Sequence, residues 1–298
     1  MKQLLKKLWI SAGNLMTALM SLFAVLLFSS RKVARNLRTI SKNVDTTRKA
    51  FVIGNGPSFK EVLSQQSLVQ ELIDGDTIVC NGFALSDVFE IIRPCYYVML
   101  DPELFNEERI EIDESIKTMY QRFECVDWSM ILFLPKGTNL RVVKKRIKNN
   151  KIKICLFNAT TVDGPSSFRN IIYRNNLGLP NSRNVILPAL MLMINFRYQN
   201  VYLYGADFSW VKNFDVDPRN NKLFLNDGHF YKTNNIIYED STYPYEKGYY
   251  RFYLECVAYM LRGTEIIADY AESCGIKVVN RTKGSFIDAF EYENPDKL

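Results

Sequence analysis

The stretch FVIGNGPSFKEVL, residues 51–63, decides how this chain is expected to fold. Three β-prone residues run into the turn 54–58, and an apolar spacing typical of a helix follows. Glycines permit a positive φ and a close backbone approach, and a helix that begins here would offer free N–H groups to an anion. The stretch therefore predicts a strand, a tight turn and a helix, with either a ligand loop or a plain connection at the turn.

Short apolar runs alternate with helical stretches along the rest of the chain, which is typical of an α/β fold with a mostly parallel sheet. Several runs lack polar alternation, as strands covered on both faces do. Strands are predicted at 50–53, 77–80, 96–100, 130–134, 152–157, 201–204 and 277–280. Helices are predicted at 187–196, with Pro188 in the first turn, and at 249–273, capped by Gly275. We predict one Rossmann-like domain over residues 50–298.

Residues 211–247 differ from the rest, because they are rich in Asn, Asp and Tyr and show no clear period. A segment of this length inside a compact domain is usually functional or disordered. It follows a predicted strand and contains His229, the only histidine of the chain. We interpret it as a lid over an active site, and one histidine excludes a His-rich metal centre.

Charge and cysteine usage exclude two broad classes of protein. Residues 1–50 carry ten Lys or Arg and one acid, Asp45, whereas the whole chain is +6, so residues 51–298 have a net charge of −3. A mildly acidic body argues against nucleic-acid binding. The six cysteines are scattered, without a CxxC pair, which argues against a disulfide scaffold or a zinc site and favours a reducing compartment.

The N-terminus is expected to attach the protein to a membrane. Residues 8–28, LWISAGNLMTALMSLFAVLLF, hold no charge and give roughly 31 Å of helix, about one hydrocarbon thickness. A basic stretch follows at once, suited to anionic headgroups. We predict a membrane anchor over residues 1–30 and a basic juxtamembrane linker over 31–49. By the positive-inside rule, the chain would be a single-pass protein of the inner membrane with its catalytic domain in the cytoplasm.

Polar residues follow four predicted strands: Asn55, Asn81, Asp101 and Asp207. In an open α/β sheet, ligands bind outside the carboxyl ends of the strands. Four such side chains on one rim, able to bond a base, a ribose or a sugar, predict a binding site there.

These motifs, taken in order, carry a family resemblance. GNGPS near the domain start, then CN at 80–81, a D-P-x-L-F element at 101–105, Y-L-Y-G-A-D-F at 202–208 and N-D-G-H-F-Y at 226–231 resemble the family-42 bacterial sialyltransferases. Related domains occur in flagellin nonulosonic-acid transferases and in a pterin diphosphokinase. The resemblance covers most of residues 50–235.

The resemblance implies a Rossmann-like domain that binds CMP-sialic acid without a metal ion or other cofactor. His229 would then be the base that deprotonates the acceptor hydroxyl. Asn55 and Asn81 would lie near the donor phosphate and nucleotide, and Gly205 and Asp207 near the cytidine ribose. The expected donor-binding residues are Gly54, Asn55, Gly56, Ser58, Asn81, Asp101, Arg183, Gly205, Asp207 and Tyr231, with Trp210 and Lys232 as further candidates.

The sequence departs from the family pattern in two places. Asp101 stands where the sialyltransferases have asparagine, and Arg183 precedes Asn-Val-Ile-Leu rather than the Thr-Ser-Gly that cradles the sialate carboxylate. The expected activity is transfer of an acidic, sialic acid-like sugar from a CMP-sugar to a glycan or lipid-linked acceptor, with the donor sugar itself open.

Two other functions stay open from the sequence. Asp215 and Asp217 form a DxD pair, and such oxygen ligands can hold Mg²⁺ on a diphosphate. An ATP- and Mg²⁺-dependent diphosphokinase-type transferase on the same scaffold is therefore one alternative. A non-catalytic membrane scaffold for polysaccharide assembly is the other.

Overall fold

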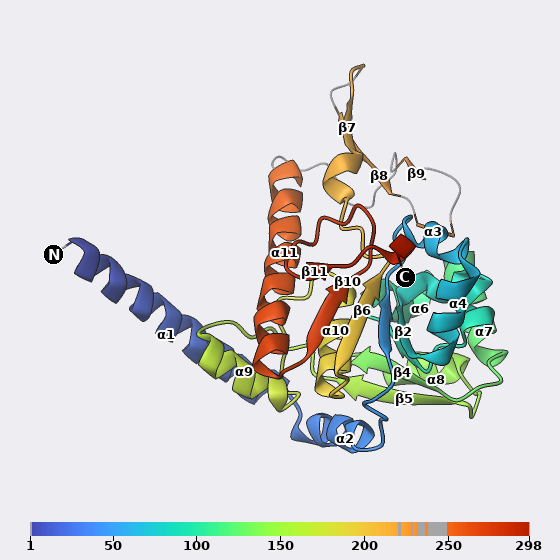
Figure 1. Cartoon of the computed structure of the whole chain (residues 1–298), viewed down its shortest axis with the longest axis horizontal. Coiled ribbons are helices and arrows are strands. Elements are labelled where there is room, and N and C mark those ends of the chain that lie inside the picture. The colour runs from blue at the N-terminus through green and yellow to red at the C-terminus, as the bar shows by residue number, and fades with distance from the viewer. Residues whose placement is uncertain (1, 220–221, 228, 232–235, 238–248, 298) are drawn as a thin grey trace.

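Strands and helices alternate from Ala50 onward in a computed structural model of the chain (Figure 1). The structure describes residues 2–219, 222–227, 229–231, 236–237 and 249–297, with the backbone alone for 2–12, 213–214, 217, 222–227, 236–237 and 249. The strands are β1 Ala50–Ile53, β2 Asp76–Cys80, β3 Tyr96–Val98, β4 Met130–Pro135, β5 Ile152–Phe157, β6 Asn200–Tyr204, β7 Phe214–Asp217, β8 Lys222–Asp227, β9 Ile236–Ile237, β10 Lys277–Asn280 and β11 Glu291–Tyr292. The helices are α1 Lys2–Phe28, α2 Arg31–Ser41, α3 Phe59–Leu63, α4 Gln66–Asp74, α5 Val88–Ile92, α6 Glu107–Ile112, α7 Glu114–Glu124, α8 Leu140–Arg146, α9 Ser166–Arg174, α10 Ile186–Asn195 and α11 Tyr249–Ser273, with the 3-10 turns η1 Asn81–Leu85, η2 Pro102–Phe105, η3 Trp210–Asn213 and η4 Pro295–Lys297.

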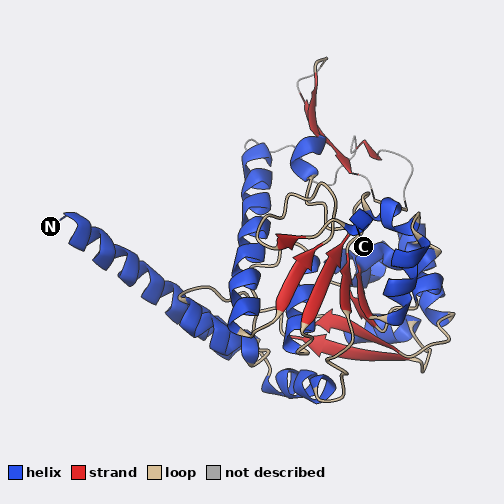
Figure 2. Ribbon diagram, viewed as in Figure 1, coloured by secondary structure: helices blue, strands red, loops and turns tan. Residues whose placement is uncertain are grey.

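An eight-stranded sheet in the order β11-β10-β6-β1-β2-β3-β4-β5 forms the centre, and all its neighbouring strands pair in parallel (Figure 2). This confirms the predicted α/β, Rossmann-like class and every predicted strand, although β3 ends at Val98 rather than at Leu100. The chain runs outward from β1 to β5 and then returns to the other side of β1 with β6. The strand order therefore reverses between β1 and β6, which is where ligands bind in sheets of this type.

Both faces of the sheet are covered, which explains why the strands are continuously apolar. In β1, Ala50 and Val52 belong to one buried cluster with α10 and α11, while Phe51 and Ile53 belong to a second cluster with α3–α7. All four β1 side chains are fully buried. Alternate side chains thus fill opposite cores.

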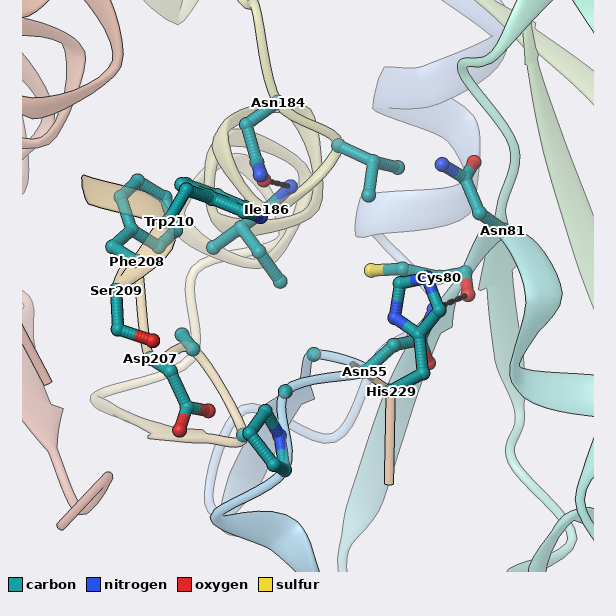
Figure 3. A pocket seen from close by; sticks show the side chains of 16 residues that line it. Asn55, Cys80, Asn81, Asn184, Ile186, Asp207, Phe208, Ser209, Trp210 and His229 are labelled. Carbon is teal, nitrogen blue, oxygen red and sulfur yellow. Dashed lines mark hydrogen bonds between the residues drawn. The ribbon is translucent and has the colours of Figure 1, made fainter. Parts of the chain in front are cut away.

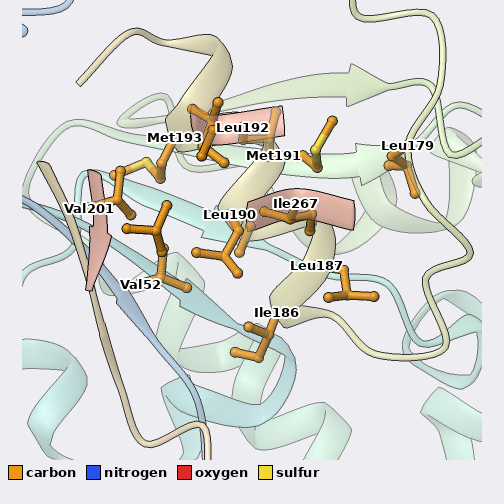
Figure 4. Packing of buried hydrophobic residues seen from close by; sticks show 14 of the residues in the cluster. Val52, Leu179, Ile186, Leu187, Leu190, Met191, Leu192, Met193, Val201 and Ile267 are labelled. Atoms are coloured by element: carbon orange, nitrogen blue, oxygen red, sulfur yellow. The ribbon is translucent and has the colours of Figure 1, made fainter. Parts of the chain in front are cut away.

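Helix α10 lies in the middle of the first core and is apolar on every side. Residues 186–194 are all buried, as expected of a helix with no polar stripe. Figure 4 shows its side chains between Val52 and Val201 of the sheet and Ile267 of α11. The two predicted helices are confirmed at Ile186–Asn195 and Tyr249–Ser273, and Gly275 follows with a φ of +69°.

Two helices precede the sheet, in the region expected to attach the chain to a membrane. α2 occupies much of the predicted linker and buries Val33, Ala34, Leu37 and Ile40, on the side that contacts β5. Where the structure describes side chains, which for α1 means residues 13–28, no helix alone has the length and apolar content of a membrane span, but residues 13–28 and 31–41 together do, as a pair bent by 89°.

The predicted lid contains a second, small sheet. β7, β8 and β9 pair antiparallel in that order, with Phe214 opposite Leu225 and Asp227 opposite Ile236. They stand at the end of the molecule to which the carboxyl ends of β6 and β10 point (Figure 1). The lid role itself stays a prediction.

Candidate functional site

The turns after β1 and β6 cross each other in direct backbone contact. The Gly54 and Gly56 amides donate to the carbonyl oxygens of Tyr204 and Gly205, each at 2.8 Å. A Cβ at Gly54 would lie 2.4 Å from the Gly205 oxygen, and one at Gly205 would lie 2.5 Å from the Gly54 oxygen. Gly205 also has a φ of +62°, which disfavours any L side chain. Glycine is therefore required at positions 54 and 205, because the backbones of the two turns are in direct contact there.

Asp207 occupies the space behind the glycine turn. Its carboxylate accepts from the Ser58 hydroxyl at 2.7 Å and from the Ser58 amide at 3.2 Å, and a Cβ on Gly56 would lie 1.8 Å from it. Burial raises the pKa of Asp207, against the opposing effect of the two Ser58 hydrogen bonds. The amide at the start of the short helix α3 is thus already bound to a carboxylate of the protein, so this helix start is not free for a ligand anion.

Two asparagines at neighbouring strand ends hold the next part of the rim. Asn55 donates from Nδ2 to the carbonyl of Cys80 at 3.0 Å, while its buried Oδ1 has no hydrogen-bond partner within the described part of the chain. Asn81 has a φ of +44° and accepts at Oδ1 from the Leu100 amide at 3.0 Å. Because buried polar atoms are rarely left unpaired, Asn55 Oδ1 is an acceptor available to a ligand.

His229 is held over the pocket by its neighbour in the sequence. Phe230 is buried between Phe59 and Phe83, with ring centroids 5.2 and 5.4 Å away, and its amide donates to the Asn55 carbonyl at 3.1 Å. The rings of His229 and Tyr231 stack at 5.2 Å. A Cβ at Gly82 would lie 2.6 Å from the Tyr231 hydroxyl, so a larger residue at position 82 would displace the end of the tyrosine side chain.

These parts surround one pocket at the carboxyl ends of β1, β2 and β6 (Figure 3). Asp207 and Ser209 lie on one side, whereas Asn55, Asn81 and His229 lie on the other. The complete lining is Gly54, Asn55, Gly56, Pro57, Cys80, Asn81, Asn184, Val185, Ile186, Gly205, Ala206, Asp207, Phe208, Ser209, Trp210 and His229.

The lining contains residues that the sequence analysis did not single out. Asn184 accepts from the Ile186 amide at 2.7 Å and brings the start of α10 to the pocket. Its signal was an asparagine four residues before Pro188, a pattern typical of a helix start. Ser209 had no such signal. Cys80 lines the pocket as well, and burial raises the pKa of its thiol, which disfavours the reactive thiolate.

Several predicted site residues lie outside the pocket. Ser58 lies behind the glycine turn, and Asp101 is exposed and accepts from the Glu103 amide at 3.0 Å. Arg183 is exposed next to the lining residue Asn184. Tyr231 stacks on His229 without lining the pocket. Lys232 lies outside the described residues.

Metal ligands do not cluster in the part of the chain that the structure describes, where no group of three or more His, Cys, Asp or Glu side chains meets. Asp215 lies on β7 and is exposed, and the side chain of Asp217 is outside the described part. The polar side chains that line the pocket supply one imidazole, one half-buried carboxylate, the amide groups of three asparagines, the Ser209 hydroxyl and the Trp210 indole. That set suits binding of a polar ligand and transfer of a proton to the imidazole.

Comparison with known proteins finds similarity to solved structures. No family model matches the chain, and no curated protein sequence is similar enough to count as a relative. The structure of the MAf glycosyltransferase from Magnetospirillum magneticum AMB-1 is similar, with a TM-score of 0.50 and 12% identity over 90% of this chain. The match spans 39% of that protein. At this identity the likeness supports the fold, that of a glycosyltransferase-like α/β domain.

Proposed function

We propose that this chain is a glycosyltransferase that moves an acidic, sialic acid-like sugar from a CMP-sugar to a glycan or lipid-linked acceptor, without a metal ion. The observation that carries the proposal is the position of His229 over a pocket at the β1–β6 switch point, opposite Asp207. The similarity in fold to a glycosyltransferase supports it.

In the proposed reaction, His229 is the general base. The His229 imidazole takes the proton of the acceptor hydroxyl as the acceptor oxygen bonds to the anomeric carbon. The bond from that carbon to the phosphate oxygen breaks, and CMP leaves with the electron pair. One displacement of this kind inverts the anomeric centre. CMP is a good leaving group, so one base and stabilisation of the phosphate charge are sufficient.

The start of α10 supports an acidic donor. Residues 184–186 line the pocket, and the N-terminus of a ten-residue helix carries partial positive charge. Pro188 leaves one fewer amide there, and the Ile186 amide is bound by Asn184. Although neither position has an amide free to bind an anion, the partial positive charge of the helix dipole at this end favours a carboxylate or phosphate of the donor. Asn55 Oδ1 would accept a hydrogen bond from a hydroxyl of the CMP-sugar or from the amino group of its cytosine ring.

The test is hydrolysis or transfer by the full chain in detergent, across CMP-, UDP- and GDP-sugars and ATP, each with and without EDTA. We expect CMP release that resists EDTA and falls at least 100-fold in His229→Ala, because loss of a general base costs roughly that factor. Asp101→Ala is the matched control, since Asp101 lies outside the pocket, and should keep activity within about twofold.

The same assay distinguishes the proposed function from the two alternatives, a diphosphokinase-type transferase and a non-catalytic scaffold. Turnover of ATP alone, abolished by EDTA, would support a diphosphokinase-type transferase and make the acidic residues the site. A chain that turns over none of these donors, and whose cellular function survives His229→Ala and Asn55→Ala, would be a scaffold. Either result would overturn the proposed function.

A further inference from the structure

Helix α1 has two different faces over residues 13–28, the part whose side chains the structure describes. The face toward the body is made of small residues, Ala18, Ser21, Ala24 and Val25, which are buried or half-buried. The opposite face consists of large apolar side chains that are 40–67% exposed: Leu15, Met16, Leu19, Met20, Leu22, Phe23, Leu26, Leu27 and Phe28. So large a continuous apolar surface marks an interaction site rather than a free protein surface.

The C-terminal half of α1 is fixed to the body by specific polar contacts. Ser21 Oγ donates to the Asp163 carbonyl and accepts from the Asp163 amide, both at 3.0 Å. Ser29 Oγ bonds the Leu177 carbonyl at 2.5 Å. Buried Asn158 bonds both the amide and the carbonyl of Ser30. The helix therefore lies against the domain from about residue 18 to residue 30.

This docking leaves too little free helix to cross a bilayer. Ser21 lies seven positions before Phe28, roughly 10 Å along the helix axis. In a spanning helix, the Asp163–Arg262 ion pair (2.7 Å) beside Ser21 would enter the hydrocarbon, which is costly for charged groups. Of the part of α1 that extends beyond the docked region, only residues 8–17 form an uncharged stretch, roughly 15 Å long, whereas the hydrocarbon core is about 30 Å thick.

Helix α2 adds a basic surface next to the apolar one. Its buried side, Val33, Ala34, Leu37 and Ile40, packs on the domain, and the chain bends by 89° between α1 and α2. Its exposed side chains include four cations, Arg31, Lys32, Arg35 and Arg38, and Lys42 follows the helix directly; Arg38 also donates to Asn175 Oδ1 at 2.6 Å. Basic residues at the edge of an apolar face are complementary to anionic headgroups above acyl chains.

We propose that α1 and α2 together dock this protein on one leaflet of an anionic bilayer, with the outer face of α1 in the acyl boundary and the α2 cations on the headgroups. The helix pair is then a monotopic anchor and not a span. This inference is independent of the proposed function, because it uses none of the pocket residues.

Topology is tested with Gln3→Cys in sealed membrane vesicles whose cytoplasmic face is outward, labelled with a membrane-impermeant maleimide. Exposed Cys125 in the body is the internal reference, and labelled peptides are separated by mass spectrometry. A monotopic anchor labels position 3 and Cys125 alike in intact vesicles. Labelling of Cys125 in intact vesicles, with position 3 labelled only after permeabilisation, would show a span and overturn the proposal.

Lipid contact is tested by flotation of the full chain with vesicles of phosphatidylcholine containing 30% phosphatidylglycerol or none. We expect Arg31→Gln/Lys32→Gln/Arg35→Gln to weaken partitioning to the anionic vesicles by roughly 100-fold, since each cation near such a surface contributes about fivefold. Leu19→Gln/Phe23→Gln/Leu26→Gln should abolish binding to both compositions.

Two matched variants complete the design. Arg141→Gln/Lys144→Gln/Lys148→Gln removes three exposed cations elsewhere, and Ile91→Gln/Ile112→Gln removes exposed apolar side chains elsewhere. Both should bind like the parent chain, and circular dichroism checks that every variant is folded. Equal losses in the matched variants, or a lipid-free dimer whose α1 variants dissociate while vesicle binding is absent, would contradict docking on a bilayer.

Discussion

Gly205 shows at the scale of one residue how the fold restricts the sequence of the site. It combines a positive φ of +62° with a carbonyl oxygen where its Cβ would be. The glycine turn of residues 54–56 looks like a phosphate loop in the sequence. In the structure its glycines allow two backbones to cross and admit the Asp207 carboxylate. The pocket for a ligand lies in front of that crossing.

Three glycine substitutions separate conformational strain from steric clash. Gly205→Ala combines both effects and should destabilise the protein by about 3 kcal/mol or more. Gly284→Ala has strain alone, because its φ is +71° with open space around it, and should cost about 1 kcal/mol. Gly137→Ala has neither and should change stability by less than about 0.5 kcal/mol. Urea unfolding gives the order, and equal costs would contradict the crossing argument.

Asp207 should give the folded state a pH-dependent stability. Its pKa is raised in the folded protein, so the folded state binds a proton that the unfolded state has already lost. The stability it contributes is full below the ordinary carboxyl pKa and is lost as pH rises through the raised value. Asp207→Asn removes this loss. Its stability relative to the parent chain should therefore increase from pH 4 to pH 7 in urea unfolding, and a difference independent of pH would contradict the burial effect.

At the scale of the element, the buried Phe230 ring and the hydrogen bond from its amide to the Asn55 carbonyl position the segment 229–231. Phe230→Ala should release His229 from the pocket, because removal of a buried phenylalanine costs about 3 kcal/mol or more. The opening is local, so hydrogen exchange of the amide at position 230 should accelerate on the order of 100-fold while the global unfolding transition changes little. Ile112→Ala, at a 69% exposed position, is the control and should leave that exchange rate unchanged.

Seven strands of the central sheet could be predicted from the sequence because each is a short apolar run followed closely by Gly, Asn, Asp or Pro, whereas β7, β8, β9 and β11 were not predicted. The contacts of the site could not be predicted. The Ser58–Asp207 hydrogen bond joins residues 149 positions apart and exists only because β6 returns beside β1. The packing of α2 was missed because its basic residues suggested a linker, although Val33, Leu37 and Ile40 have helical spacing. Asp101 is a polar residue that follows a strand, as a site residue would, but its side chain accepts a hydrogen bond from the Glu103 amide and so caps the turn η2.

At the scale of the whole molecule, Arg281 joins the C-terminal segment to the sheet. It is 3% exposed, bonds Glu293 at 2.7 Å and Glu71 at 3.1 Å, and lies 3.8 Å from the centre of the Tyr202 ring. Three separate parts of the chain therefore meet at one guanidinium. Its planar shape serves both the paired carboxylates and the aromatic ring.

Arg281→Ala should destabilise the protein by about 3 kcal/mol or more, since it removes a buried guanidinium from the Tyr202 ring and from two half-buried carboxylates. Arg281→Lys should restore less than half of the stability lost in Arg281→Ala, because an ammonium group cannot form bidentate hydrogen bonds to carboxylates and cannot stack on an aromatic ring. Arg93→Ala breaks an exposed pair with Asp127 and should cost less than about 1 kcal/mol. Thermal unfolding compares the three, and similar costs for Arg281 and Arg93 would show that the buried cluster has no special role.

The central claim, that the pocket at the β1–β6 switch point binds a cytidine nucleotide beside His229, has a direct test. The chain contains one histidine, so an untagged sample gives one imidazole signal in a heteronuclear NMR spectrum. We expect CMP to shift that signal saturably, and Asn55→Ala to weaken the response, while Asp101→Ala leaves it unchanged. An imidazole signal whose chemical shift is unchanged at saturating CMP but changes with ATP and Mg²⁺ would contradict binding of a cytidine nucleotide in this pocket.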